Sequence, residues 1–247
     1  MAKPFVFALV CDVLGAQNVR RRLGVNATGL PFNSLAAVEL GPDGRTNPLV
    51  NAGAIAIASL APGDTHEARW TFLHEGPLRV RRPSADARRG GLRVGLGHQP
   101  PQPRAGRPTG ELPVGCEPTQ AVDLYTRQSC LRVTAVDLAT MGATLANGGI
   151  RPGSTDRVVD TAVCHFALAV MATAGLYESS GDWLYDVGVP GKSGIGGGIV
   201  VVSPGKGALA TFAPPLDGFG NSIRGQLAAR YLSHRLGLTL FASEPTP

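Results

Sequence analysis

The 247-residue sequence predicts a single α+β domain in which helices flank an antiparallel sheet. Helical segments stand near both ends of the chain, at residues 3–14 and 221–236. Two β-rich runs, 199–203 and 208–212, are joined by Pro204-Gly205-Lys206-Gly207, which is a hairpin signal. A late hairpin between terminal helices is typical of an α+β layer fold. No internal repeat is visible.

Turn and cap signals predict the elements between these ends. Residues 31–48 are rich in Gly, Pro, Asn and Asp and predict a loop. Asn51 stands near the N-cap of a helix of small residues, and Thr134 offers an N-cap with Asp137 in the first turn that follows. Gly175 ends the last of these helices. The helices are expected at residues 51–58, 65–75, 136–147 and 161–174.

Composition favours a soluble, cytoplasmic protein. Hydrophobic residues make up 43% and charged residues 17% of the chain, and no apolar run reaches the ~18 residues of a membrane-spanning helix. Lys3 followed by the apolar residues 4–11 resembles a short signal peptide. Asp12 interrupts the apolar run, however, and a buried helix is favoured. Four cysteines fit no zinc spacing and are expected to be reduced thiols: Cys11, Cys116, Cys130 and Cys164.

The basic character belongs to one segment, residues 77–115. This segment carries eight Arg and only two acids, a balance of +6 within a net charge of +5, so the rest of the chain sums to −1. Of its 39 residues, 14 are Pro or Gly and none is aromatic, so it is expected to be disordered. Nucleic-acid binding is disfavoured because no aromatic side chain is available there to stack on bases.

The residues that carry chemistry are two lysines in distinctive settings. Lys192-Ser193-Gly194 directly precedes the first hairpin strand, and a Lys-Ser/Thr-Gly triad on an edge strand is one mark of serine-acylating β-lactamases and penicillin-binding proteins. A second mark is S-x-x-K, in which one helical turn places the lysine amine against the serine hydroxyl. Lys3 heads an apolar helix as that pattern requires, and the serine would directly precede Met1. Taken alone, each lysine has an ordinary structural interpretation.

Six spaced segments together resemble the glutaminase family, in the order that the family has them. The resemblance covers residues 1–76 and 116–241. The segments are N-P-L-V-N-A-G-A-I at 47–55, D-L-Y-T-R-Q-S-C at 123–130, L-A-N-G-G at 145–149, G-L-Y-E-S-S-G at 175–181, P-G-K-S-G-I-G-G-G at 190–198 and G-N-S at 220–222. In the family the last two residues of the second segment stand in the reverse order.

This resemblance implies a β-lactamase/DD-peptidase-like fold and hydrolysis of L-glutamine to L-glutamate and ammonia through a serine acyl-enzyme. It implies that Lys3 is the general base, that Asn51, Tyr125 and Tyr177 hold glutamine, and that Tyr177 also relays protons. The backbone N–H of Ile195 would help to form the oxyanion hole. Lys192, Ser193 and Gly194 would form the edge of the pocket. Without the resemblance, Asn51 would be a helix cap and the tyrosines aromatic residues at the rim of the core.

The family also implies a homotetramer, with no metal or organic cofactor and no nucleic-acid or membrane partner. The sequence departs from the family in two ways. The S-x-x-K serine is not among residues 1–247, so the domain is expected to be incomplete at its N-terminus. The Ser-Glu and Arg-Asn pairs that the family has within the region of 77–115 are missing. The polypeptide 1–247 is therefore expected to show no glutaminase activity. The alternatives are a non-catalytic remnant (a pseudoenzyme) and another β-lactamase-like serine hydrolase.

We predict that residues 77–115 are encoded in a shifted reading frame. Arg, Pro and Gly are the residues that GC-rich DNA yields out of frame. Read one base later, residues 92–94 can become Ser-Glu-Trp and residues 98–104 can become Thr-Asn-Arg-Arg-Asn-Arg-Ala. The nucleotide sequence of the gene tests this prediction. It is wrong if no single-base gain, followed by a later loss, restores the family's residues.

Overall fold

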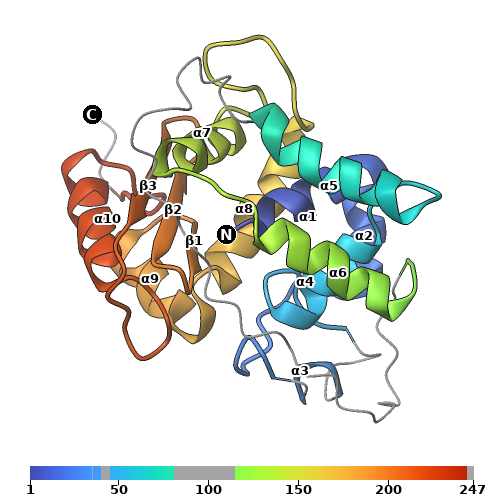
Figure 1. Ribbon diagram of the computed structural model, residues 1–247. Helices are drawn as coiled ribbons and strands as arrows, with labels where there is room; N and C mark the ends of the chain where they lie inside the picture. The colour runs from blue at the N-terminus through green and yellow to red at the C-terminus, as the bar shows by residue number, and fades with distance from the viewer. Residues whose placement is uncertain (35, 40–44, 81–114, 244–247) are drawn as a thin grey trace.

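The computed structural model describes residues 1–34, 36–39, 45–80 and 115–243 (Figure 1). Within these ranges the sheet has the order β1-β2-β3 and is antiparallel throughout. Its strands are β1 (Gly191–Gly194), β2 (Gly198–Ser203) and β3 (Gly207–Phe212). The predicted hairpin and the predicted edge position of Lys192 are both confirmed, and the fold is α+β.

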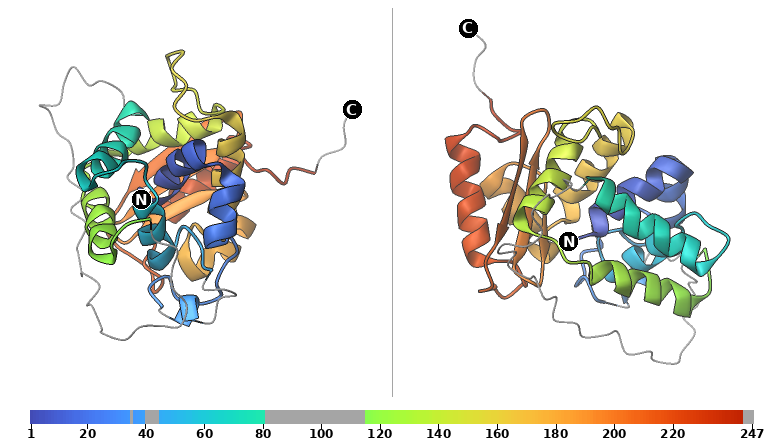
Figure 2. Two further views of the ribbon diagram at one scale, coloured as in Figure 1. Left: turned by 90° about the vertical axis from the view of Figure 1, so that its right-hand side faces the viewer. Right: turned by 45° about the horizontal axis from the view of Figure 1, so that its top comes forward.

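Alternation along β2 divides the apolar interior into two clusters. Val200 and Val202 face the larger cluster, which includes α1 (Lys3–Leu14), α7 (Ala135–Ala146) and α8 (Thr161–Ala174). Ile199 and Val201 face a smaller cluster with α9 (Ser180–Val187) and α10 (Ile223–Arg235). Because successive side chains of a strand point to opposite faces, both faces of β2 are buried. The right-hand view of Figure 2 shows α10 and α7 on opposite sides of the sheet.

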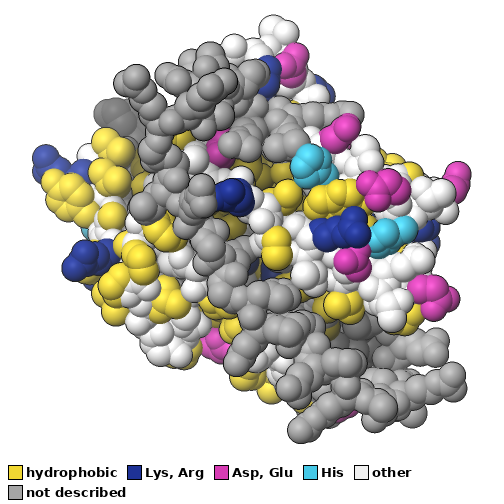
Figure 3. Space-filling view, viewed as in Figure 1, with side chains coloured by type: hydrophobic (Ala, Val, Ile, Leu, Met, Phe, Trp, Pro, Cys, Tyr) yellow, Lys and Arg dark blue, Asp and Glu magenta, His cyan; other side chains and the backbone are white. Residues whose placement is uncertain are grey.

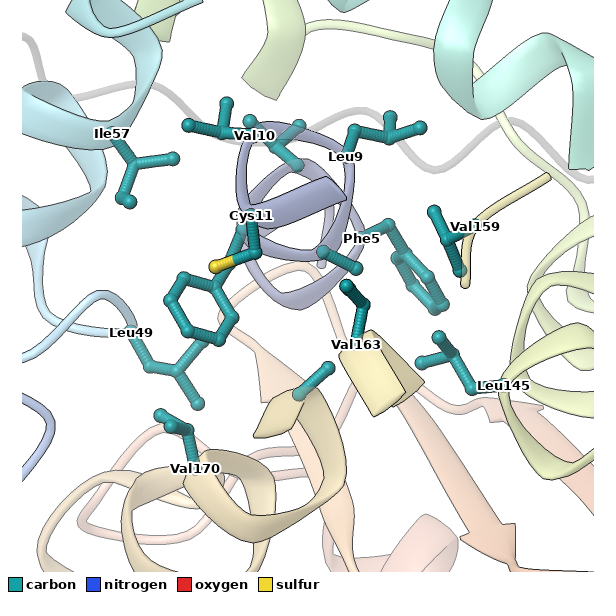
Figure 4. Packing of buried hydrophobic residues seen from close by; sticks show 14 of the residues in the cluster. Phe5, Leu9, Val10, Cys11, Leu49, Ile57, Leu145, Val159, Val163 and Val170 are labelled. Atoms are coloured by element: carbon teal, nitrogen blue, oxygen red, sulfur yellow. The ribbon is translucent and has the colours of Figure 1, made fainter. Parts of the chain in front are cut away.

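Helix α1 is the centre of the larger cluster. All residues from Pro4 to Cys11 are buried, as expected for a helix that is apolar on every side. Figure 4 shows side chains of α1 surrounded by Leu49, Ile57, Val163 and others from several segments. This burial confirms the predicted helix at residues 3–14 and explains why its first residue, Lys3, starts next to the protein interior.

Local signals predicted several boundaries correctly. Thr134 caps α7 through a capping box with Asp137, since each side chain accepts a hydrogen bond from the other residue's backbone N–H. Helix α8 ends before Gly175, where a Cβ atom would lie 1.8 Å from the Gly191 carbonyl oxygen. The remaining helices are α2 (Ala16–Leu23), α3 (Ala36–Glu39), α4 (Asn51–Ser59), α5 (His66–Val80), α6 (Pro118–Ser129) and the 3-10 turn η2 (Tyr177–Ser179).

The structure corrects three sequence predictions. The N-cap position of α4 is Val50, not Asn51, so the side chain of Asn51 is free for another role. The short helix α3 lies within the predicted loop 31–48. Helix α5 extends to Val80, so the first four residues of the segment 77–115 are helical. Residues 81–114 lie outside the described residues, and the prediction of disorder there is not tested.

In the described part of the chain, no single helix is long and apolar enough to cross a membrane. Helix α8 and the segment Tyr177–Val187 satisfy the length and composition criteria only as a pair, and the two are bent by 100° at the break between them.

Candidate active site

The first part of the site is a hydrogen-bonded group of three side chains from three helices. The Lys3 amine, at the start of α1, donates to the side-chain oxygen Oδ1 of Asn51 at 2.8 Å and to the carbonyl oxygen of Leu49 at 3.0 Å. The Tyr125 hydroxyl, from α6, donates to the same Oδ1 at 3.1 Å. Asn51 is the first residue of α4, and its backbone N–H donates to the Phe32 carbonyl oxygen. The predicted residues Lys3, Asn51 and Tyr125 thus meet in one place.

The Lys3 amine faces no carboxylate among the described residues, since its hydrogen-bond partners there are an amide oxygen and a carbonyl oxygen. Burial lowers the pKa of this amine from 10.5 to about 7, because desolvation disfavours the charged form. A lysine with that pKa is largely neutral in mildly alkaline solution and can then accept a proton.

Tyr177 lies in a strained backbone conformation. Its φ of 56° is the only positive value at a non-glycine residue in the described ranges. Three hydroxyl and amide contacts hold this turn. Ser180 Oγ donates to the Tyr177 carbonyl oxygen at 2.7 Å and accepts the backbone N–H of Leu176 at 3.0 Å, while Ser179 Oγ donates to the Leu176 carbonyl oxygen at 2.9 Å. The buried Asn221 donates to Ser179 Oγ at 2.9 Å. Strain of about 1–3 kcal/mol persists only where such contacts impose it.

The ring and hydroxyl of Tyr177 connect this turn to the edge strand and to Lys3. Its ring lies 4.5 Å from that of Phe32, centroid to centroid, and the Lys3 amine lies 5.9 Å from the centroid of the Phe32 ring. The Tyr177 hydroxyl donates to the Ser193 carbonyl oxygen at 3.4 Å, and the backbone N–H of Ile195 lies near the same hydroxyl. Burial raises the pKa of this hydroxyl above 10, and the Ile195 N–H opposes the rise. Tyr177, Ile195 and Lys3 therefore border the same region.

The predicted pocket edge needs a correction. The register pairs Lys192 with Val200 and Ser193 with Ile199, and paired residues share a face of the sheet. The Ser193 side chain therefore faces the smaller cluster, away from Lys3, and its buried hydroxyl has no partner. Lys192 is only 1% exposed and lies under the Tyr177 ring rather than lining an open pocket. The alternation of side chains along a strand is the reason.

Gly194 marks the place where the edge strand approaches the start of α1. A Cβ atom at this position would lie 3.0 Å from the Met1 side chain. The amines of Lys3 on α1 and Lys192 on β1 are also close enough for the charge of Lys3 to lower the pKa of Lys192.

Sequence reasoning missed two residues that build the site. Phe32, within the predicted loop 31–48, bridges Tyr177 and Lys3. Asn221 belongs to the G-N-S segment, with no role predicted for its side chain, and it bonds to Ser179 of the strained turn, 42 residues away. Its position directly after a glycine, in a segment that resembles the family, was the available signal. Among the described residues, no three His, Cys, Asp or Glu side chains are grouped to hold a metal ion.

Comparison with known proteins points to one family. The glutaminase family pattern matches residues 1–82 and 109–241. Glutaminase 2 of Yersinia pestis is 55% identical over 99% of this chain and 72% of its own length, and a glutaminase of Brucella canis is 43% identical over 98% and 77%. Among solved structures, the probable glutaminase ybaS superposes with a TM-score of 0.82 at 36% identity, covering 98% of this chain and 79% of that one.

We predict that the Lys3 amine titrates near pH 7 in the folded protein, because burial disfavours its charge. The chain has only three lysines, so ¹³C at Cε gives one NMR signal for each, and the exposed Lys206 serves as the reference.

Between about pH 7 and 10.5 the unfolded state binds more protons at Lys3 than the folded state. The free energy of unfolding should therefore rise with pH in that window by up to about 1.4 kcal/mol per unit, and less in Lys3→Met. A Lys3 signal that titrates near 10.5 contradicts the prediction.

Proposed function

Because the chain belongs to the glutaminase family, we propose that its site hydrolyses the side-chain amide of L-glutamine to L-glutamate and ammonia. The observation that carries this proposal is the meeting of Lys3, Asn51, Tyr177 and Ile195 in one region. A solved structural neighbour at 29% identity, Mglu, is described in its glutamate form, which supports an amino-acid ligand of this size.

In the proposed reaction, Lys3 is the general base. A serine hydroxyl one helical turn before Lys3 would attack the carboxamide carbon, and the neutral amine would take the hydroxyl proton. That proton would pass to the leaving nitrogen as the C–N bond breaks, so that ammonia departs and an ester remains. Water would then add to the ester carbon, with its proton taken by the same amine, and release of glutamate would restore the serine.

Two groups would bind the oxygen atoms of the substrate. The Ile195 N–H lies near the Tyr177 hydroxyl in this structure, and we propose that it donates to the developing oxyanion when substrate is present. Such a donor is worth about 3 kcal/mol of barrier. Asn51 uses its oxygen for Lys3 and Tyr125, which leaves its NH₂ group to donate to a substrate oxygen. Tyr125 thereby orients Asn51, and Tyr177 stands between Lys3 and the oxyanion position.

We further propose that residues 1–247 form a single domain and that a shifted frame explains the segment 77–115. The interruption of the family match between residues 82 and 109 supports this proposal. Without the Glu and Asn that the family has in this region, the amino-acid end of glutamine loses a charge-assisted hydrogen bond, so binding should be weak.

All four cysteines are free thiols, which supports a reducing, cytoplasmic setting.

We also propose that the protein forms a homotetramer. Three large side chains, Ile223, Leu227 and Tyr231, stand four residues apart along one face of α10 and are 43%, 63% and 63% exposed. Tyr185 of the neighbouring α9 is 91% exposed. Figure 3 shows hydrophobic side chains gathered on the side of the molecule where α10 lies. A contiguous exposed apolar stripe of this kind is typical of a subunit interface.

We predict that light scattering after gel filtration gives four times the chain mass of 25.6 kDa. The double variant Leu227→Glu, Tyr231→Glu should dissociate the assembly, because it places charge in an apolar interface. The matched control is Val136→Glu, which changes an exposed apolar residue on α7. A wild-type protein that is monomeric at micromolar concentration is contrary to the proposal.

We predict that the polypeptide 1–247 releases no ammonia from L-glutamine, whereas the same chain preceded directly by serine does. The added hydroxyl supplies the missing nucleophile, and an alanine in the same place is the control. The rate should increase as pH rises through about 7, because Lys3 must lose its proton to act as a base.

Equal ammonia release by the serine and alanine forms contradicts the serine mechanism. If the serine form binds L-glutamate but does not turn over glutamine, the chain is a non-catalytic remnant. Hydrolysis of nitrocefin without hydrolysis of glutamine would instead show another β-lactamase-like serine hydrolase.

A further inference from the structure

Lys192 is the largest fully buried side chain in the described part of the protein. It stands on β1 opposite Val200, on the face of the sheet that turns toward α1. Its amine donates to the Gly175 carbonyl oxygen at 2.9 Å and to its neighbour's carbonyl, that of Ser193. The amine also lies 4.5 Å from the centroid of the Tyr177 ring.

The backbone does not need this amine to satisfy its hydrogen bonds. The Gly175 carbonyl oxygen already accepts the Ser193 N–H at 3.1 Å, and the Ser193 carbonyl oxygen already accepts the Tyr177 hydroxyl at 3.4 Å. No carboxylate among the described residues pairs with Lys192. A buried amine without an ion pair is costly, and an apolar side chain of similar length would fill the same space without that cost. A buried ionisable group that stability does not require indicates a functional constraint.

The contact that the backbone cannot replace is the one with the Tyr177 ring. The serines and Asn221 around Tyr177 fix its backbone, because their hydrogen bonds join backbone groups and one another rather than the ring. The ring contacts Phe32, at 4.5 Å between centroids, and the Lys192 amine, and its hydroxyl donates to the Ser193 carbonyl oxygen. Phe32 belongs to a loop, whereas Lys192 belongs to the sheet. The sheet therefore supplies the rigid support for the ring.

We propose that Lys192 is a positioning residue for glutamine hydrolysis, whose amine holds the Tyr177 ring so that the hydroxyl stays beside the Ile195 N–H. The expected effect of Lys192 on the rate rests on the proposed function, whereas the expected effect of Lys192 on the position of the Tyr177 ring does not. Lys192 acts through Tyr177 and does not itself touch the substrate. Burial and the nearby charge of Lys3 lower the pKa of Lys192 well below 10.5. The ammonium form has three N–H groups, which match the two carbonyl oxygens and the ring face, whereas the neutral amine has two.

The test compares Lys192→Met with the matched control Lys206→Met, which makes the same change at an exposed position on the hairpin. The first measurement is the tyrosine ¹³Cζ NMR spectrum of the chain 1–247, which has only four tyrosines. Tyr177→Phe assigns the signal. We expect Lys192→Met to shift or split the Tyr177 signal and to leave those of Tyr185 and Tyr231 in place. We expect Lys206→Met to change none of them.

The second measurement is kinetic and uses the chain preceded by serine. Misplacing the Tyr177 hydroxyl should lower kcat by about 100-fold, with KM changed by less than about threefold, because the ring position matters chiefly in the transition state. Lys192→Gln, which keeps an N–H donor, should retain the Tyr177 signal and recover part of kcat. If the serine form of the wild type does not hydrolyse glutamine, the proposed function fails while the NMR result still decides the role of Lys192.

The proposal is overturned if folded Lys192→Met keeps both the wild-type Tyr177 signal and the wild-type kcat. Should Lys192→Met fail to fold, the wild-type protein decides the geometry. The Cε protons of Lys192 must then show the upfield ring-current shift of a group over an aromatic face, with the Cε protons of Lys206 as the unshifted reference. The proposal is also overturned if that shift is absent. It is overturned as well if Lys192→Gln loses kcat while its Tyr177 signal stays as in the wild type.

Discussion

The burial of the Lys3 amine is the interaction on which the rest of the site depends. An apolar helix in the middle of the larger cluster brings its first residue next to the interior, where no carboxylate from the described ranges compensates the charge. In the part of the chain that the structure describes, the amine's hydrogen-bond partners are dipoles, namely the oxygens of Asn51 and Leu49. The amine is thus oriented without being kept charged, which is what a lysine base near neutral pH requires.

The second constraint is the strained turn at Tyr177. Three of the segments that resemble the glutaminase family, although distant from one another in sequence, meet at this turn. The segment 175–181 contains the turn itself, Asn221 of the segment 220–222 bonds to it, and Lys192 and Ile195 of the segment 190–198 reach its ring and hydroxyl. Each segment supplies contacts that the others lack. Strain of this kind is maintained by the surrounding structure and places an aromatic hydroxyl where a relaxed backbone would not.

Much of the fold could be predicted because its signals are local. Three elements are each predicted by residues within a few positions of one another. They are the cap of α7 at Thr134 and Asp137, the hairpin turn at 204–207 and the apolar helix after Lys3. The site residues Lys3, Asn51, Tyr125 and Tyr177 came from family resemblance, and the structure brings them together. The helices α2, α6 and α9 were not predicted, although α2 has Val19 and Leu23 on one buried face and arginines in its last turn. The true orientations of Asn51, Ser193 and Lys192 depend on strand register and on partners distant in sequence.

The central claim is that Lys3, Asn51, Tyr177 and the Ile195 N–H together form one binding site for the substrate L-glutamine. The most direct test is a crystal structure of this chain, preceded by serine, with L-glutamate bound. The account predicts that one oxygen of the side-chain carboxylate lies within hydrogen-bond distance of the Ile195 N–H, and that another oxygen of the ligand accepts from Asn51. Glutamate bound away from these groups, with the Ile195 N–H still on the Tyr177 hydroxyl, would contradict it.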